Sequence, residues 1–519
     1  MILPRRALLA ATAATAATAL PRNAIGRTDD RPSLTIAVQK IANTGTLEPL
    51  REQSSNASEH YIGALLETPI ARNQQHWLER QPGLAESWRR IDDKTVELTL
   101  RPNVRYHDGG TLTAEDVAWN FGPERMFGAA LPADIPPVAK RHWPALARVE
   151  ATGPLTVRFV NETPDITMEG RLSAGGSEIV NPRSFRTPWI DYAKKPGGTG
   201  PYKLREFRPD VSLTLDAHDD YWGGRPPFKS LRILEIGEAS ARANGLLSGE
   251  YDIACDILPD QIQDIEATGK HLVRGGPVPN HRIVNFDMHH PALADPRVRR
   301  AMAHAIDGRA LVDALWAGRT QVPPGLQFPF YGPMLVDDWT VPATDPATAR
   351  DLLKQAGYRG DSIPYRIRNN YYVAETATAQ ALVAMWQGVG LNVEISVHEN
   401  WGGVLAKTPQ RGLRDWSNSA TFDDPVSSIV NQEGPNGAQQ GVGEWTNAEM
   451  NRLCGAMESS TDIAARRGIF ARMLQICERD DPAYMVLHQN ANFTGIRKSL
   501  RWPGTASFYV DLSPRGMVF

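Results

Sequence analysis

Cysteine is scarce in this sequence. Only Cys255, Cys454 and Cys477 occur among 519 residues, and an odd number leaves at least one thiol free or bonded to another chain. Cys454 and Cys477 fall on two expected helices that meet near residues 459–462, about 9 Å and about 24 Å from that turn at about 1.5 Å per residue. We therefore expect no bond between them and interpret all three cysteines as buried packing residues.

A large charge of one sign and long apolar runs are also lacking. The formal net charge of −3 gives no general attraction to nucleic acid or anionic lipid, so no nucleic-acid partner is expected. After the N-terminal segment, no uncharged apolar run approaches the roughly 20 residues that span a bilayer. The composition, 41% hydrophobic and 22% charged, is ordinary for a soluble globular protein, and the length predicts about two to four domains.

Known catalytic motifs are incomplete wherever they begin. His398-Glu399 lacks the second histidine of a zinc protease, because position 402 is glycine. In GLLSG (245–249) the serine is displaced from the centre of a nucleophile elbow, and GVG (388–390) lacks the third glycine of a dinucleotide loop. We predict that the protein is not an enzyme, with a secreted hydrolase as a remote alternative.

Metal-ligand spacing is missing as well. His289 and His290 are adjacent, so on a strand they point to opposite faces, and no further histidine or cysteine lies nearby at ligand spacing. We expect neither a metal site nor a cofactor.

One stretch, RYHDGGTLTAEDVAWNF (105–121), invites a catalytic interpretation through His107 and Asp108. Adjacent residues of a strand point to opposite faces, so the two cannot easily act on one substrate. Asp108 and the two glycines after it suit a turn, and Thr113 lies three residues before Asp116, a capping-box pattern that opens a helix. We interpret the stretch as structural.

The N-terminus has the pattern of an export signal. A basic start, MILPRR, precedes the apolar run ALLAATAATAATA and the cleavage-like triplet Ala17-Thr18-Ala19. We assign residues 1–31 to an export signal and leader, which predicts a periplasmic protein. Arg5-Arg6 also suits a twin-arginine signal, and an ordinary Sec signal is the alternative.

The rest of the chain alternates strands and helices. SLTIAVQK (33–40) and TVELTLRPNVRY (95–106) have the period-two pattern of strands. A second run of strands and helices starts with RIVNFDM at about residue 281 and continues with a pair of helices that begins at Asp295-Pro296. A helix that ends at Gly357 and a strand over 365–370 follow. This alternation predicts two α/β units, the second of about 200 residues.

Several stretches, in order, resemble the extracytoplasmic solute-binding proteins of family 5, which serve peptide-, opine- and nickel-type ABC importers. The resemblance covers nearly the whole mature chain and is most specific in five segments: LAESWRRIDDKTVELTLRPNVRYHDGGTLTAEDVAWNF (84–121), GGTGPYKLREF, HDDYWGGRPPFKSLRI, LLSGEYDI and DPRVRRAMAHAIDGRALVDAL. NNYYVAETATAQALVAMWQGVGLNV and RDWSNSATFDDPVSSIVNQEGPNG look closest to the opine branch, which includes the agrocinopine-binding protein.

The resemblance implies an α/β, two-lobe periplasmic binding protein (type II, large form) with a ligand cleft between the lobes. Lobe I would comprise residues 32–283 with an extra subdomain near 61–194, lobe II residues 284–489, and the tail 490–519 would return to lobe I. Such a protein captures a small polar organic solute in the periplasm and delivers it to the permease and ATPase subunits of an importer. We expect a monomer, with a di- or oligopeptide receptor as the alternative within this class.

The resemblance also places certain loops at the cleft. Asn and Gly there could simply form turns and the aromatic residues could belong to the core, but together they suit a polar solute with a ring. The predicted ligand-binding residues of these loops are Asn43, Thr44, Gly45, Asn369, Asn370, Tyr371, Tyr372, Trp416, Ser417, Asn418, Asn436 and Gly437.

Two arginines could hold an anionic group. Arg366 and Arg368 alternate along their strand, so both project to one face, where paired guanidinium groups suit a phosphate or a carboxylate. The alternative is an ordinary solvated strand face.

The segment SATFDDP (419–425) bears on the ligand class. Peptide-binding members of the family commonly have an aspartate here that holds the peptide ammonium group, and in this chain Thr421 takes that place, with Asp423 two positions further on. A neutral threonine cannot compensate a buried ammonium. We therefore include Thr421 and Asp423 in the predicted site and expect an opine-like, glycoside or sugar-phosphate ligand.

Overall fold

The structure is a computed structural model that describes residues 29–519 except 54–55, 77, 186–187, 370 and 410. The expected export signal lies almost entirely outside the described residues, as does Asn370 of the predicted site. Within the described part of the chain, no helix is long and apolar enough to cross a membrane.

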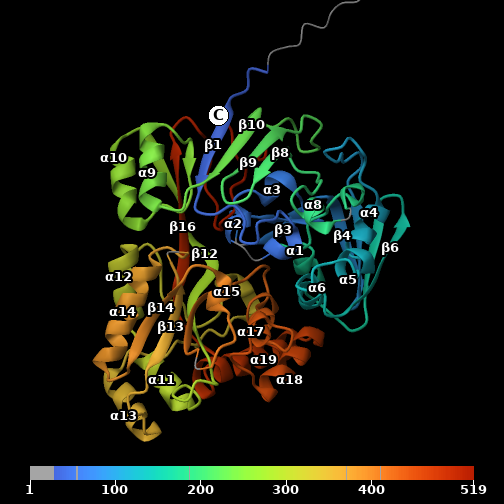
Figure 1. Cartoon of the computed structure of the whole chain (residues 1–519). Coiled ribbons are helices and arrows are strands. Elements are labelled where there is room, and N and C mark those ends of the chain that lie inside the picture. Colours follow the sequence, from blue (N-terminus) through green and yellow to red (C-terminus); the bar gives the residue numbers. More distant parts are fainter. Residues whose placement is uncertain (1–28, 54–55, 77, 186–187, 370, 410) are drawn as a thin grey trace, which may run out of the picture.

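One ten-stranded sheet runs through the whole molecule, in the order β14-β13-β15-β12-β16-β11-β1-β10-β9-β8. Its fourth and fifth strands, β12 (His271–Phe286) and β16 (Tyr484–Arg497), pair antiparallel. They connect the upper half of the molecule, with strands β11, β1, β10, β9 and β8, to the lower half, with strands β15, β13 and β14 (Figure 1). The boundaries expected at 283/284 and 489/490 fall inside these two strands.

The crossing between the halves lies slightly before the first expected boundary. β12 pairs with β15 (Leu413–Ser419) of the lower half from Asn280 onward, and its ladder with β16 is interrupted between Pro277 and His281. The sequence predicted that this strand starts near residue 281, whereas β12 begins ten residues earlier, at His271. Gly275 makes the extension possible: its φ is 123°, and a Cβ would lie 2.0 Å from the Asn492 carbonyl oxygen.

The upper half is built on β1 (Ser33–Val38), which pairs in parallel with β10 (Ser230–Glu235) and β11 (Ile253–Ala254). The alternating sequence SLTIAV gives β1 its buried side chains, which pack with those of the neighbouring strands in one core. The sheet ends with the antiparallel hairpin of β9 (Ser212–Ala217) and β8 (Tyr202–Arg208). Helices α9 (Ala239–Ser248) and α10 (Ile262–Ala267) flank it.

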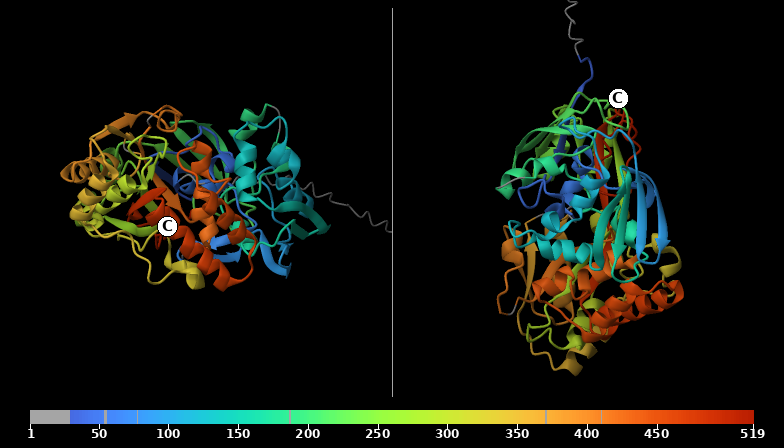
Figure 2. Two further views of the ribbon diagram at one scale, coloured as in Figure 1. Left: turned by 90° about the horizontal axis from the view of Figure 1, so that it is seen from below. Right: turned by 90° about the vertical axis from the view of Figure 1, so that its right-hand side faces the viewer.

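A smaller, separate sheet forms the core of the region expected as the extra subdomain. Its antiparallel order is β4-β5-β7-β6, with β4 Ala85–Asp92, β5 Thr95–Leu100, β6 Leu146–Gly153 and β7 Thr156–Asn161 (Figure 2). The period-two residues Val96, Leu98 and Leu100 are fully buried. Three helices accompany this sheet: α4 (Ala114–Asn120), α5 (Pro123–Phe127) and α6 (Ile135–His142).

His107 and Asp108 hold this region together through different partners. The His107 ring accepts a hydrogen bond from the Gly198 N–H (3.3 Å) and lies 3.1 Å from the Gly200 carbonyl oxygen. Asp108 instead forms an ion pair with Arg183, 3.0 Å from its Nε. The two side chains therefore have separate structural contacts.

The lower half repeats the α/β arrangement. β13 (Ile363–Arg368) lies between the parallel strands β14 (Val393–His398) and β15. The helices predicted from Asp295-Pro296 onward are confirmed: Asp295 caps α11, and Gly357 ends α13 with φ 67°. The helices of this half are α11 Pro296–His304, α12 Gly308–Trp316, α13 Pro346–Ala356, α14 Glu375–Gly388, α15 Trp401–Val404, α16 Ile429–Glu433, α17 Ala438–Val442, α18 Ala448–Ser459 and α19 Ile463–Gln475.

Short elements complete the upper half near the interface. They are α1 Pro49–Glu52, α2 Asn56–Glu59, α3 Ile62–Leu65, β2 Ile70–Asn73, β3 Glu79–Pro82, α7 Met168–Arg171 and α8 Trp189–Ala193.

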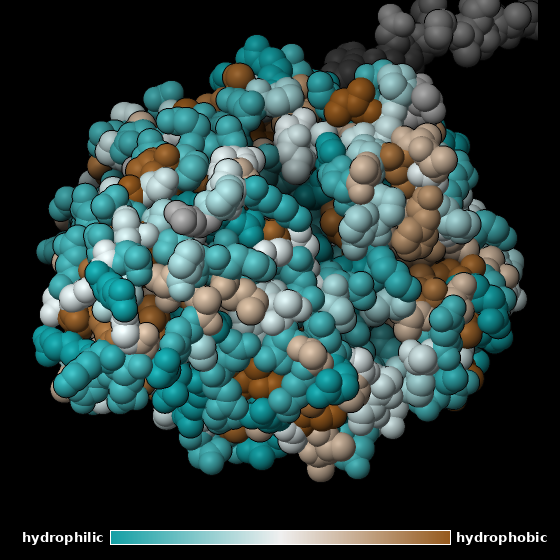
Figure 3. Space-filling view, turned by 60° about the horizontal axis from the view of Figure 1, so that its bottom comes forward, coloured by the Kyte–Doolittle hydropathy of each residue, from teal (hydrophilic) through white to brown (hydrophobic). Residues whose placement is uncertain are grey.

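The three cysteines are free and buried, as expected. Most of the lower face is hydrophilic, with hydrophobic residues in small scattered groups (Figure 3).

His289 and His290 have different neighbours: the His289 ring lies 3.0 Å from Asp287 Oδ1, and the His290 ring lies 3.1 Å from the Ser362 carbonyl oxygen. Among the described residues, no group of three or more His, Cys, Asp or Glu side chains is arranged to hold a metal ion.

The start of α4 gives a local test of the fold. The predicted capping box is present: Thr113 Oγ1 accepts from the Asp116 N–H (3.2 Å), and Asp116 Oδ2 accepts from the Thr113 N–H (3.0 Å). Thr113→Ala should cost about 1 kcal/mol and speed hydrogen exchange in α4 about fivefold. Thr113→Ser keeps the hydroxyl and should exchange like the wild type; equal exchange in all three proteins would contradict this role of Thr113.

Candidate ligand-binding cleft

A cavity of about 300 Å³ lies between the upper and lower halves, with walls from both. The upper half contributes Asn43, Arg51, Gln53, Asn56, Arg141 and His142. The lower half contributes Tyr371, Tyr372, Trp401, Leu405, Trp416, Ser417, Ser419, Thr421, Ser427, Asn431, Gln432 and Ala438.

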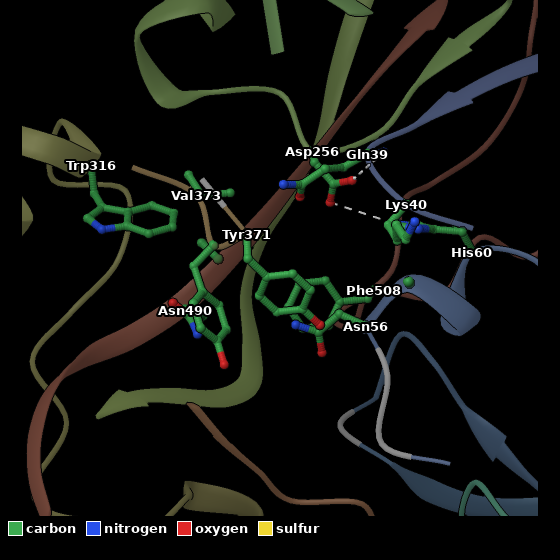
Figure 4. Close-up of a pocket in the computed structure, with 13 residues that line it drawn as sticks. Gln39, Lys40, Asn56, His60, Asp256, Trp316, Tyr371, Val373, Asn490 and Phe508 are labelled. Atoms are coloured by element: carbon green, nitrogen blue, oxygen red, sulfur yellow. Dashed lines mark hydrogen bonds and ion pairs between the residues drawn. The ribbon is translucent and has the colours of Figure 1, made fainter. Parts of the chain in front are cut away.

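A smaller cavity of about 40 Å³ adjoins this one and shares Asn56, Tyr371 and Tyr372 with it. In Figure 4, Tyr371 of the lower half points toward Asn56 and Phe508 of the upper half. On the upper wall, His60 Nε2 lies 3.7 Å from Asp256 Oδ1. We call these two adjoining cavities between the halves the cleft.

Six predicted residues line the larger cavity: Asn43, Tyr371, Tyr372, Trp416, Ser417 and Thr421. Asn43 follows β1 and Tyr371 follows β13, so both stand at the carboxyl end of a strand, where α/β proteins place their ligands. Asn43 Nδ2 donates a hydrogen bond of 3.1 Å to Tyr371 Oη across the interface. This contact joins the two halves directly at the cavity.

Aromatic rings form one wall of the cavity. Tyr371 meets Tyr372 and Trp401 edge to face, with centroids 4.8 Å and 4.9 Å apart, and Trp401 meets Trp416 at 4.8 Å. Edge-to-face contacts of this kind favour a fixed arrangement of rings. Arg368 lies against the rings of Tyr371 and Trp401, 4.9 Å and 5.4 Å from their centroids. This predicted residue therefore supports the wall, although it does not line the cavity.

The loop that carries Tyr371 and Tyr372 is held by one carboxyl group. Glu375, at the start of α14, accepts hydrogen bonds from the backbone N–H groups of Arg368, Tyr371 and Tyr372, at 3.0, 2.6 and 3.2 Å. Burial, together with the nearby Asp415, raises the pKa of Glu375 to about 8. Asp415 is itself paired with the buried Arg282, whose guanidinium lies 3.7 Å from the Tyr372 ring centroid.

Other predicted residues lie behind the walls or outside the cavity. Arg366 is buried, where its Nη2 bonds Glu444 at 2.6 Å and its Nε bonds the Arg411 carbonyl oxygen at 2.9 Å. These contacts leave it in the core of the lower half. Asn418 is fully buried, and its amide has no hydrogen-bond partner within the described part of the chain.

The remaining predicted residues have structural positions. Thr44 is exposed and its hydroxyl donates to Glu52 Oε1 at 2.5 Å, and Gly45 turns the chain with φ 65°. Asp423 pairs with Arg80 of β3 at 3.1 Å. Neither Asn369 nor Asn436, both exposed, is part of the cavity wall, and Gly437 caps α17.

Sequence analysis did not identify several wall residues. Trp401 follows β14 just as Tyr371 follows β13, so the same strand-end rule could have found it. Arg51, Arg141 and His142 come from short helices of the upper half, and no local pattern separates them from surface residues.

The wall of the larger cavity is polar but carries no acidic side chain among the described residues. Within the described residues, two arginines and one histidine line the cavity, and no aspartate or glutamate does. The Thr421 hydroxyl and the Trp416 indole N–H are buried without a hydrogen-bond partner among the described residues. Buried polar groups normally have partners, so these two are suited to a polar ligand.

The pKa of Glu375 predicts a specific pH dependence of stability. The folded protein keeps a proton on Glu375 up to about pH 8, whereas the unfolded chain loses it near 4.5, so the free energy of unfolding should fall as pH rises between these values. Glu375→Gln removes this contribution and should show a smaller drop in Tm between about pH 5 and about pH 8.5. Glu399→Gln, at an exposed position of the same half, is the control; equal drops in all three proteins would argue against a protonated Glu375.

Similarity to known proteins agrees with this architecture. Residues 79–439 match the model of the bacterial extracellular solute-binding proteins, family 5, middle region. Over 444 residues the chain is 25% identical to di/tripeptide-binding protein 3 of Pseudomonas aeruginosa, covering 78% of this chain and 81% of that protein.

Two solved structures share the fold across most of their length. The periplasmic binding protein DppA from Helicobacter pylori, in complex with the peptide STSA, aligns with a TM-score of 0.82 at 19% identity and covers 94% of this chain and 98% of its own. AgaA from A. tumefaciens R10, in complex with agropinic acid, aligns with a TM-score of 0.78 at 19% identity, and the alignment covers 93% of this chain and 98% of AgaA. At these identities the likeness concerns the fold alone. Because the family match spans well over half of the sequence, the chain belongs to the bacterial extracellular solute-binding proteins of family 5.

Proposed function

We propose that the protein captures a small polar organic solute in the cleft and delivers it to the permease of an ABC importer. The observation that carries this proposal is the cavity of about 300 Å³ between the halves, walled by aromatic rings, amides and hydroxyls. An enclosed site with a few polar groups is typical of small-molecule recognition. The N-terminal segment 1–31 would export the protein to the periplasm, where it would act as a monomer without a metal or a cofactor.

Among such solutes, we favour an opine-like, glycoside or sugar-phosphate ligand over an unmodified peptide. Thr421 lines the cavity at the position where the family resemblance puts an ammonium-binding aspartate. Asp423 forms an ion pair with Arg80. A buried ammonium without a counter-charge would cost about 3–5 kcal/mol. The absence of acidic side chains from the described wall of the larger cavity therefore disfavours a free peptide N-terminus there.

A di- or oligopeptide receptor is the second candidate. It is favoured by the relatives, since the Pseudomonas aeruginosa protein that covers 78% of this chain is a di/tripeptide-binding protein. Hydrolysis has no such support from the relatives, which are binding proteins.

We expect the protein to close on its ligand without chemical turnover. The halves are joined by two adjacent strands and touch at the cavity through Asn43 and Tyr371, which suits hinge closure. Native mass spectrometry of protein isolated from its own periplasm should show a retained solute, and small-angle scattering should show compaction when that solute is added back. The solute should be recovered unchanged; a cleaved product would favour the hydrolase alternative.

The ligand class can be tested at Thr421. Wild-type protein should bind unmodified dipeptides weakly or not at all, whereas Thr421→Asp should gain dipeptide binding, because the new carboxylate compensates the ammonium group. Thr421→Asn is the matched control, because asparagine has the shape of aspartate without its charge. This variant should not gain dipeptide binding. Calorimetry with a dipeptide panel gives the answer: submicromolar binding by the wild type that requires a free N-terminus would establish the peptide receptor instead.

A further inference from the structure

Arg141 is an arginine in the cleft without a counter-ion. It lies in the last turn of α6, in the extra subdomain, is half-buried and lines the cavity. No hydrogen bond or ion pair joins its guanidinium to another side chain or backbone group of the described residues. Burial lowers the pKa of Arg141, and no neighbouring carboxylate offsets that effect.

The charged groups around Arg141 are already satisfied. Arg51, the second arginine of the wall, holds both Asp134 oxygens with its Nε and Nη2, at 2.7 and 2.8 Å. His142 Nε2 lies 2.8 Å from Gln53 Oε1, and burial together with Arg141 and Arg171 lowers the pKa of His142 to about 3, so its ring is neutral.

Lys140, the remaining basic neighbour, is exposed and donates to the Pro144 carbonyl oxygen at 2.7 Å. The uncompensated positive charge on this side of the cavity therefore belongs to Arg141.

Buried arginines elsewhere in the protein have partners. Arg171 pairs with Asp165 at 3.1 Å, and Arg466 holds both oxygens of Asp424 at 2.6 and 2.9 Å. Arg242 has no carboxylate but donates to four backbone carbonyl oxygens. Removing a cation from water without such contacts is costly, so Arg141 departs from the pattern of these arginines at a cavity where a ligand can supply the missing anion.

We propose that Arg141 is a specificity-determining residue that binds a carboxylate or phosphate group of the solute. This inference rests on the proposed function and defines the solute further: an anionic group at the wall of the extra subdomain, and an uncharged body against Trp401 and Trp416 of the lower half. A guanidinium presents two parallel N–H donors to either anion, which gives orientation as well as charge. The extra subdomain would thus contribute directly to ligand recognition.

Paired probes that differ in one anionic group test the proposal. The probes are agropinic acid against its methyl ester, for a carboxylate, and glucose 6-phosphate against glucose, for a phosphate. Binding to the full chain is followed by the fluorescence of its 13 tryptophans. Wild-type protein should bind at least one acidic probe tenfold or more tighter than its neutral counterpart, and the pair that responds identifies the anion.

Variants assign the effect to Arg141. Arg141→Gln should weaken binding of that acidic probe about 10- to 100-fold and leave the neutral probe unchanged, since one charge-assisted contact is lost. Arg141→Lys should restore part of the affinity. Lys140→Gln removes the same charge from the adjacent exposed position and should bind like the wild type, and circular dichroism verifies that each variant is folded.

Three results would overturn the proposal: equal affinity of the wild type for acidic and neutral probes, failure to bind either acidic probe, or an equal loss in Lys140→Gln. None of these affects the proposed transport role if native mass spectrometry finds a retained solute. If the protein carries no solute when it is isolated from its own periplasm and binds no probe, the proposed function itself would be contradicted.

Discussion

The antiparallel pairing of β12 with β16 makes a single sheet of the two halves. Each strand belongs to both halves: β12 meets β15 in the lower half, and β16 meets β11 in the upper half. β12 and β16 continue from one half into the other, whereas the elements on either side of them belong to one half only. The cavity lies between those elements. Its walls include the loops that follow β1 and β13, which carry Asn43 and Tyr371, and the strand β15, which carries Trp416.

Buried hydrogen bonds and a buried ion pair position the lower wall. Glu375 fixes the backbone of the tyrosine loop with three hydrogen bonds, and the ion pair of Arg282 with Asp415 lies against Tyr372. Polar and charged groups buried in this way cost free energy unless every partner is in place, which ties the aromatic wall to one arrangement. The upper wall is different, since its Arg141 still has a hydrogen-bonding capacity that the described protein does not use.

Much of the fold could be predicted from local patterns, and less of the site. Period-two alternation located β1 and β5, and the Asp295-Pro296 and Gly357 signals located the ends of α11 and α13, because these signals depend only on neighbouring residues. The start of β12 was missed, since Gly275 and Pro277 are typical of loops and only the pairing with β16 makes a strand of them. Arg366 and Arg368 project from the same strand as expected, but tertiary partners such as Glu444, which no local pattern reveals, place Arg366 in the core. Arg141 illustrates the same limit: what distinguishes it is the lack of an acidic neighbour in space.

The ladder between β12 and β16 is interrupted where the chain crosses between the halves, and Pro277 and Pro279 have no N–H to donate there. Two neighbouring strands whose pairing is interrupted at the same level would form one hinge. Such a hinge would permit rotation about one axis and resist twisting about the length of the strands. Every opening and closing would then follow the same path and bring Asn43 back to Tyr371 in the same register, so that the cleft is reassembled identically for each molecule of solute.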